Sequence, residues 1–537
     1  MKIENYSSKA RRKIENFLYT VVHLKPRQVV YLVWRRLYKP SLKRVEAPAF
    51  QLLEGFVAPI PKYRCCEGNK MTFLNITDTF SSWNETKHGM LWAYNLNYFD
   101  WLGQEGMSAE EGIKWIDKFI EEVMGYGLAV RGERLEKNNM EAAATLTANR
   151  STLKSLSMDP YPIALRSINW IKFLTLHPEY QTKSRLDALY SQVLLLRRKL
   201  EYHLLGNHLL EDAYALFMAA VFFQDQRLFR FASCLLRKQL EEQILPDGAH
   251  YEQSPMYHCI LLERLLDCIN LVRSSIFNFQ FLIFNFQLLY ASRMLGHLES
   301  IVWSDGSIPL LNDSAYGIAP TPKQLFDYAR RLEIKWEPLA MQECGYRKMT
   351  STRMEAIVDI GNITATYQPG HTHADTFNYV LNIDGKPFVV DTGISTYNKT
   401  ARRQYERSTA AHNTVGVGEC DSSRVWGGFR VGRRCHTEIT EITDDMIVAR
   451  HNGFEKPCRR RFEMTENQFV VEDWFDGEAI SYVHLAEGTD ANRLKVSGDG
   501  LIDIQTKPCE YSTEYNQFHN GTVLEITFRG HVRYTIS

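Results

Sequence analysis

The 537-residue chain lacks a net charge, a C-x-x-C cysteine pair and an apolar run long enough to cross a bilayer. Its 63 basic and 63 acidic residues cancel, so no overall field draws it to nucleic acid, and we expect no such partner. Ten cysteines without a C-x-x-C pair argue against a zinc ribbon or a disulfide framework. The aromatic run 276–290 holds four amides in 15 residues, against about 20 apolar residues for a span, and predicts a buried helix.

Apolar residues make up 45% of the chain and aromatic residues 12%. This composition supplies large cores and excludes a disordered or fibrous protein. The length predicts about three domains. Changes in sequence pattern divide the chain into a basic, partly helical segment (1–70), a helical domain (71–345) and a strand-rich domain (346–537).

The first 45 residues are strongly basic, because twelve Lys and Arg against two Glu give them a net charge of +10. Charges return at Lys25 after the apolar FLYTVVHL, and no small-residue cleavage motif follows. We therefore identify no export signal and expect a cytoplasmic protein. The interleaved Tyr19, Tyr31, Trp34 and Tyr38 allow weak contact with the inner membrane face, although a solvated helical face is the simpler interpretation. The sequence does not define an oligomeric state.

Apolar residues recur with helical spacing from about 105 to 335. Ser108 to Glu111 forms a capping box, and Asp159-Pro160 is typical of a helix start. Further helices are expected over 209–223, 228–244, 255–272 and 322–332. Their number favours a ring of helix hairpins over a four-helix bundle.

Short alternating runs replace this pattern after about residue 350. FNYVLNI and KPFVVDTG flank Asp384-Gly385, which is typical of a two-residue hairpin turn. A second hairpin is expected around Glu466-Asn467, and TVLEITFRG near the end continues the spacing. The pattern predicts an antiparallel β-sandwich.

Two clusters in the helical half carry polar side chains that are candidates for binding or catalysis. Helical spacing places Asn207, Glu211 and Tyr214 on the side opposite an apolar stripe, facing either solvent or a polar site. Ser254-Pro255 begins a helix with Tyr257 in its first turn, where the helix dipole favours a phenolate. Tyr257 is thus a candidate acid or base, with an ordinary buried tyrosine as the alternative.

Two further clusters lie in the strand-rich half. In a strand, His371, His373 and Asp375 share one face, and imidazole with carboxylate suits zinc. Exposed edge-strand histidines are the alternative. Guanidinium groups bind oxyanions bidentately, so the loop 402–407 suits a carboxylate or sulfate ligand unless it is simply solvated. Its candidate binding residues are Arg402, Arg403, Tyr405 and Arg407.

Four segments in succession resemble the heparinase II/III-like polysaccharide lyases, over roughly residues 90–430. They are GNHLLEDAYAL, DGAHYEQSPMYH, GHTHADTFNYVLNIDGKPFVVDTG and RSTAAHNTV. The resemblance implies an (α/α) toroid followed by an antiparallel β-sandwich. It also implies a carbon–oxygen lyase that cleaves a uronic-acid-containing polysaccharide or oligosaccharide, such as a glycosaminoglycan, by β-elimination.

The resemblance assigns roles by position. Asn207 matches the group that neutralises the uronate carboxylate, with His208 or Glu211 in support, and Tyr257 and His371 match the catalytic tyrosine and histidine. His373, Asp391 and His412 match the ligands of one divalent metal, expected to be zinc with a structural role.

Two other functions remain open on the sequence. A glycan-binding or polysaccharide-assembly protein would keep the same fold without turnover. A cupin-type metal-dependent oxygenase would use the H-x-H pattern with redox-active iron, but it leaves the helical half unexplained.

Overall fold

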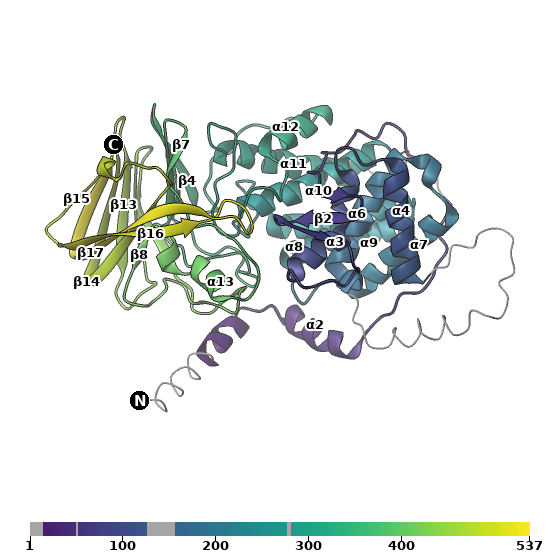
Figure 1. Cartoon of the computed structure of the whole chain (residues 1–537), viewed down its shortest axis with the longest axis horizontal. Coiled ribbons are helices and arrows are strands. Elements are labelled where there is room, and N and C mark those ends of the chain that lie inside the picture. The colour runs from purple at the N-terminus through teal and green to yellow at the C-terminus, as the bar shows by residue number, and fades with distance from the viewer. Residues whose placement is uncertain (1–13, 50–51, 126–155, 276–280) are drawn as a thin grey trace.

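A helical N-terminal region is followed by a curled antiparallel β domain in the computed structural model of the chain (Figure 1). The structure describes residues 14–49, 52–125, 156–275 and 281–537. This arrangement confirms the fold class expected from the sequence. All ten cysteines are free thiols. Among the described residues, no helix combines the length and apolar character that crossing a membrane requires.

The helical region is built around three central helices, with α8 (Gly206–Phe222) packed on both α6 (Pro160–Leu176) and α10 (Pro255–Arg273). Every residue of α8 except His208 is buried, as expected for a helix enclosed on all sides. The outer layer comprises α7 (Lys183–Lys199), α9 (Gln226–Gln243) and α11 (Phe281–Ile301). Each outer helix packs on one or more central helices, which is how a ring of hairpins buries its inner layer.

Local capping explains several helix starts. Ser108 accepts a hydrogen bond from the Glu111 amide at the start of α4 (Ala109–Phe119). Asp159 does precede α6, but its carboxylate accepts from the Tyr94 hydroxyl instead of capping the helix. The other helices of this region are α2 (Pro26–Leu37), α3 (Met90–Tyr98) and α12 (Pro322–Arg331). A small sheet that the sequence did not predict comprises β1 (Cys66–Glu67), β2 (Lys70–Phe73) and β3 (Ile76–Thr79).

The expectation of a buried helix over 276–290 is only partly met. Residues 276–280 lie outside the described residues, and α11 begins at Phe281. Gln287 and Tyr290 are buried, but Leu289 is 48% exposed. The helix belongs to the outer layer, so one of its sides remains open to solvent.

One large antiparallel sheet makes up most of the β domain, with strand order β11-β12-β13-β14-β7-β6-β5-β4, and β9 and β10 form a separate two-stranded sheet. Strand β14 (Phe469–Leu485) joins its two halves, because it pairs with β13 near its start, with β7 and β8 near its end, and with β17 (His519–Ile536) along its length. The remaining strands and the short helix α13 are β4 (Tyr346–Thr350), β5 (Met354–Asp359), β6 (Tyr379–Ile383), β7 (Lys386–Val389), α13 (Ala401–Glu406), β8 (Val415–Gly416), β9 (Val425–Trp426), β10 (Arg430–Val431), β11 (Thr437–Ile442), β12 (Met446–His451), β13 (Cys458–Met464), β15 (Leu494–Ser497) and β16 (Leu501–Tyr511).

Both predicted hairpins are present. Asp384 and Gly385 join β6 to β7 with φ angles of 52° and 72°, the left-handed pair that a type I′ turn requires. Glu466 and Asn467 lie in the turn between β13 and β14. The histidine segment, in contrast, is not a strand, because residues 371–375 lie in the loop between β5 and β6.

Candidate functional site

A cavity of about 1090 Å³ lies where the helical region meets the β domain. The helical region contributes Asn207 from α8 and Tyr257 from α10, and the loop after β5 contributes His371. Many aromatic rings line its wall, which suits a ligand with flat apolar faces. The aromatic lining residues are Tyr63, Phe73, Tyr94, Tyr98, Trp101, Tyr161, Tyr257, Tyr316, Tyr397, Phe429 and Tyr515.

Asn207 is held at the N-terminus of α8 by a carboxylate clamp. Its backbone amide donates to Glu252 Oε1 at 2.9 Å, and its side-chain Nδ2 donates to Glu252 Oε2 at 2.9 Å. The chain reaches this position through Leu205 and Gly206, whose φ angles are 63° and 59°. Positive φ is costly for a branched residue such as Leu205, so the surrounding packing must hold this turn in place.

His371 is oriented from two sides. Its Nδ1 lies 2.9 Å from Asp313 Oδ2, and its Nε2 lies 3.0 Å from Asn207 Nδ2. A carboxylate accepts a proton and an amide nitrogen donates one, so Nδ1 carries the hydrogen and Nε2 keeps its lone pair. The imidazole is therefore in the tautomer that a general base requires.

Asp313 is fully buried and is fixed by charge. Arg403 donates to both of its oxygens, at 2.5 and 2.7 Å, and His373 Nε2 lies 2.8 Å from Oδ1. Burial alone would raise the pKa of Asp313, but Arg403 and the two histidines hold it well below its ordinary value. Asp313 thus remains an anion beside His371.

Tyr257 stacks against His371, with ring centroids 3.9 Å apart. As predicted, Ser254 caps α10 and accepts from the Tyr257 amide at 3.2 Å. The Tyr257 hydroxyl lies 3.3 Å from the Tyr397 hydroxyl. Burial raises the pKa of Tyr257 above its ordinary value despite that hydrogen bond, so the phenolate expected from the helix dipole is not favoured and the phenol keeps its proton.

Sequence models of two heparinase domains match the chain, the heparinase II/III N-terminus over residues 186–330 and the heparinase II/III-like C-terminal domain over residues 333–531. The chain belongs to the heparinase II/III-like family. No curated protein sequence matches it.

Solved structures of low sequence identity share the fold. A crystal structure of heparinase III superposes with a TM-score of 0.60 at 14% identity, over 94% of this chain and 88% of that one. A heparinase III gene product superposes with a TM-score of 0.59 at 16% identity, over 84% of this chain and 80% of that one. Heparan sulfate lyase HepC from Pedobacter heparinus superposes with a TM-score of 0.51 at 14% identity, over 95% of this chain and 87% of that one.

The arginines of the loop 402–407, expected to bind oxyanions, contact other residues of the protein instead of lining the cavity. Arg403 and Arg407 are buried, the first on Asp313 and the second on the Thr372 carbonyl. Arg402 pairs with Glu406 and Glu510. None of these arginines, nor Tyr405, is among the described residues that line the cavity. The guanidinium groups of Arg403 and Arg407 instead brace the histidine loop, through Asp313 and the Thr372 carbonyl.

Of the two expected supporting residues, only His208 reaches the cavity. Its Nδ1 lies 2.9 Å from Glu201, and although burial lowers the pKa of His208, Glu201 raises it above its ordinary value. Glu211 lies one helical turn further along α8, fully buried, 3.8 Å from Arg264. Glu211 does not line the cavity and belongs to the helical core, and its burial raises its pKa to about 7. Tyr214, on the same row, is also buried.

The expected metal ligands lie together in a buried cluster. The His373 and His412 rings are 5.2 Å apart, and His373 Nδ1 and His412 Nε2 have no hydrogen-bond partner. Asp391 accepts from His412 Nδ1 at 2.8 Å and from Asn378 at 2.6 Å. Two imidazole nitrogens therefore fit a metal, whereas Asp391 orients His412 in the manner of a carboxylate behind a ligand.

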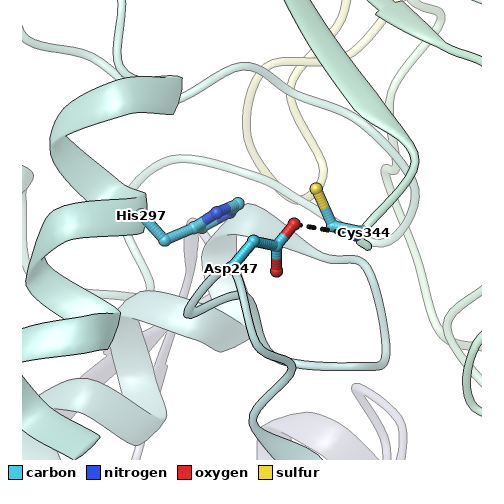
Figure 2. Close-up of side chains that lie close together, drawn as sticks. All are labelled: Asp247, His297 and Cys344. Carbon is cyan, nitrogen blue, oxygen red and sulfur yellow. Dashed lines mark hydrogen bonds between the residues drawn. The ribbon is translucent and has the colours of Figure 1, made fainter. Parts of the chain in front are cut away.

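A second cluster, Asp247, His297 and Cys344, has tighter spacing (Figure 2). Within the described part of the chain, only these three residues offer ligand atoms that all lie within 4.8 Å of one another. Asp247 already accepts from the Gln342 and Cys344 amides at 3.0 and 2.9 Å. Its carboxylate thus connects the loop after α9 to the segment that leads into β4.

Sequence reasoning missed Glu252, Asp313 and Tyr397. Glu252 lies inside the quoted DGAHYEQSPMYH motif, so proximity to Tyr257 was an available signal. Asp313 and Tyr397 carried no signal, since their positions relative to His371 depend on the packing of the two domains.

Proposed function

We propose that the protein is a polysaccharide lyase that cleaves a uronic-acid-containing glycan by β-elimination. The proposal rests chiefly on one observation: Asn207, Tyr257 and His371 converge on a single cavity, with a lone pair on His371 and a proton on Tyr257. The names of the similar structures, heparinase and heparan sulfate lyase, support a glycosaminoglycan substrate. Arg64 and Lys399 also line the cavity and suit an anionic chain, whereas Lys62, in the same wall, is paired with Glu263.

Asn207 would receive the uronate carboxylate. Removal of the C5 proton places negative charge on that carboxylate, so a donor there stabilises the transition state. Both Nδ2 hydrogens are engaged, one by Glu252 and one by His371. The bond to His371 is the one that a substrate carboxylate would replace, and this exchange would leave the His371 lone pair directed at the sugar.

His371 would then take the C5 proton and Tyr257 would protonate the C4 oxygen of the departing sugar. Asp313 stabilises the imidazolium that His371 becomes. The C5–H electron pair forms the C4–C5 double bond as the C4–O bond breaks, and Tyr257 supplies the proton to the leaving oxygen. A neutral phenol suits this acid role because its proton is present before the reaction begins.

One structural divalent metal, with zinc expected, would be held by His373 Nδ1 and His412 Nε2, the two unpartnered nitrogens. When bound, it would cross-link the loop that carries His371 to the segment after α13. The residues of this chain perform the elimination, and the metal would keep His371 in place.

A panel of uronate polymers tests the proposal: heparan sulfate, chondroitin, hyaluronan and alginate, followed by the near-ultraviolet absorbance of a new C4–C5 double bond. We expect one polymer to yield unsaturated product. Tyr257→Phe should lower kcat at least a hundredfold, the scale of a lost general acid, with glycan binding and melting temperature retained. Tyr94→Phe is the matched control, because Tyr94 lines the same cavity but donates its hydroxyl to Asp159.

Full activity in Tyr257→Phe would contradict the acid assignment. Glycan binding without unsaturated product from any polymer would instead favour the non-catalytic glycan-binding function.

A further inference from the structure

Exposed apolar side chains are concentrated near the start of the described chain. Of the 24 large hydrophobic residues that are exposed in the described part, 13 lie between residues 14 and 38. Scattered single apolar residues are normal on a surface, but a contiguous group marks an interaction site. The thirteen are Ile14, Phe17, Leu18, Tyr19, Val21, Val22, Val29, Val30, Leu32, Val33, Trp34, Leu37 and Tyr38.

The first helix, residues 14–21, contacts the β domain through its polar side. The Thr20 hydroxyl accepts from Trp426 Nε1 at 3.2 Å and lies 3.3 Å from the Val431 carbonyl. Four apolar residues follow i, i+3, i+4 and i+7 spacing and form one stripe. They are Ile14, Phe17, Leu18 and Val21, exposed by 61%, 55%, 58% and 38%.

Helix α2 has the same inverted arrangement against the helical region. Buried Gln28 donates to the Leu204 carbonyl at 3.2 Å, Tyr31 packs on Tyr202, and Arg35 contacts His203. On the opposite side lie Val29, Val30, Val33 and Leu37, exposed by 44%, 62%, 56% and 78%. An ordinary surface helix buries its apolar stripe, whereas here both helices bury polar groups and expose apolar ones.

Positive charge accompanies the exposed stripes. The first 45 residues carry a net charge of +10, and Arg36 and Lys39 are exposed beside the apolar face of α2. Apolar residues with surrounding Lys and Arg complement a bilayer with anionic headgroups, because the side chains insert while the cations meet the phosphates. A protein partner would not by itself require this excess of one sign.

We propose that residues 14–21 and α2 form a docking surface that lies flat on an anionic lipid bilayer. Both helices lie along the lower edge of the molecule in Figure 1, one under each domain. At 12 residues, α2 is about 18 Å long, much less than the roughly 30 Å of a hydrocarbon core, so it rests in the interface. This surface would hold the cavity at a membrane, independently of the reaction performed there.

Vesicle sedimentation with the full-length protein tests the docking surface. Vesicles of phosphatidylcholine with phosphatidylglycerol (3:1) are compared with pure phosphatidylcholine. A variant with Phe17→Gln, Leu18→Gln, Val33→Gln and Leu37→Gln should bind the anionic vesicles about tenfold less than the wild type, since binding scales with the apolar area inserted. Ile439, Ile442, Ile502 and Ile504, exposed by 40%, 48%, 54% and 41% on the β domain, provide the matched control when all four become Gln.

The expected pattern is strong binding of wild type and control to anionic vesicles, weak binding to neutral ones, and loss at high salt. Circular dichroism confirms that the variant is folded. Equal vesicle binding by variant and wild type would overturn the proposal. It would also be overturned if the wild type binds no vesicles and light scattering shows a dimer that the four substitutions dissociate, because the surface would then join two copies of this chain.

Discussion

The His371 imidazole and the Asp313 carboxylate form a buried pair, with Nδ1 and Oδ2 2.9 Å apart. The pair connects two domains, because Asp313 precedes α12 in the helical region and His371 lies in the loop before β6. Its effect is to direct the proton-free Nε2 of His371 toward Asn207 and the cavity. The position of the proposed base is therefore set by the contact between the domains.

Asp313→Asn should lower kcat by about a thousandfold with little change in KM. The amide removes the negative charge that stabilises the imidazolium and allows the other tautomer, whereas Asp313 itself does not line the cavity. Steady-state kinetics on the polymer identified by the panel provide the measurement. Asp359→Asn, which changes a buried aspartate of the β domain, is the control, and wild-type kcat in Asp313→Asn would contradict the base assignment.

The sequence predicts much of the fold because helix and hairpin signals are local. The apolar spacing over 209–223 and Asp384-Gly385 both depend on near neighbours, and both appear where expected. Asn207, Tyr257 and His371 became candidates through helical spacing, a helix start and strand-like alternation, and the family motifs then gave them roles. All of these signals also depend on neighbouring residues.

The missed features depend on tertiary contacts. Arg403 has the chemistry of a substrate-binding residue, but Asp313 binds its guanidinium in the interior. Residues 371–375 alternate like a strand, but these histidines bond to Asp313 and the segment adopts a loop. No spacing rule could identify Asp313 as the partner, since it lies 58 residues before His371 in the chain.

Glu211 should make stability decline as the pH rises from about 4.5 to 7. Burial raises the folded-state pKa to about 7 from the ordinary 4.5, so the folded chain holds one more proton than the unfolded chain in this window. Stability therefore falls as pH rises and levels off above pH 7. In Glu211→Gln this decline disappears, and the difference between pH 5 and pH 8 should shrink by about 2 kcal/mol.

Urea unfolding at the two pH values measures this difference. Glu466→Gln, a substitution in the exposed turn between β13 and β14, should leave the pH dependence unchanged. An unchanged pH dependence in Glu211→Gln would show that Glu211 is ionised in the folded protein.

His373→Ala and His412→Ala should each lower both the metal content and the melting temperature. Each removes one of the two unpartnered imidazole nitrogens, and a metal that binds only the folded state contributes to its stability. Elemental analysis and thermal unfolding provide the measurements. His297→Ala, from the cluster in Figure 2, should keep the metal; the reverse result would locate the metal at Asp247, His297 and Cys344.

Gly206→Ala should lower kcat/KM by about 10- to 100-fold, because it displaces the clamp that holds Asn207. A Cβ on Gly206 would lie 2.5 Å from Glu252 Oε1, the atom that accepts from the Asn207 amide. Misplacing a binding group by a fraction of an ångström to one ångström has an effect of this size.

Gly385→Ala is the control that separates the backbone cost from the clash, because Gly385 has a similar positive φ of 72° but nothing within 4 Å of its Cβ position. The positive φ should cost each variant about 1 kcal/mol of stability, the clash should cost Gly206→Ala more, and only Gly206→Ala should lose activity. Equal activity in the two variants would mean that the Glu252 clamp does not position Asn207 for the reaction.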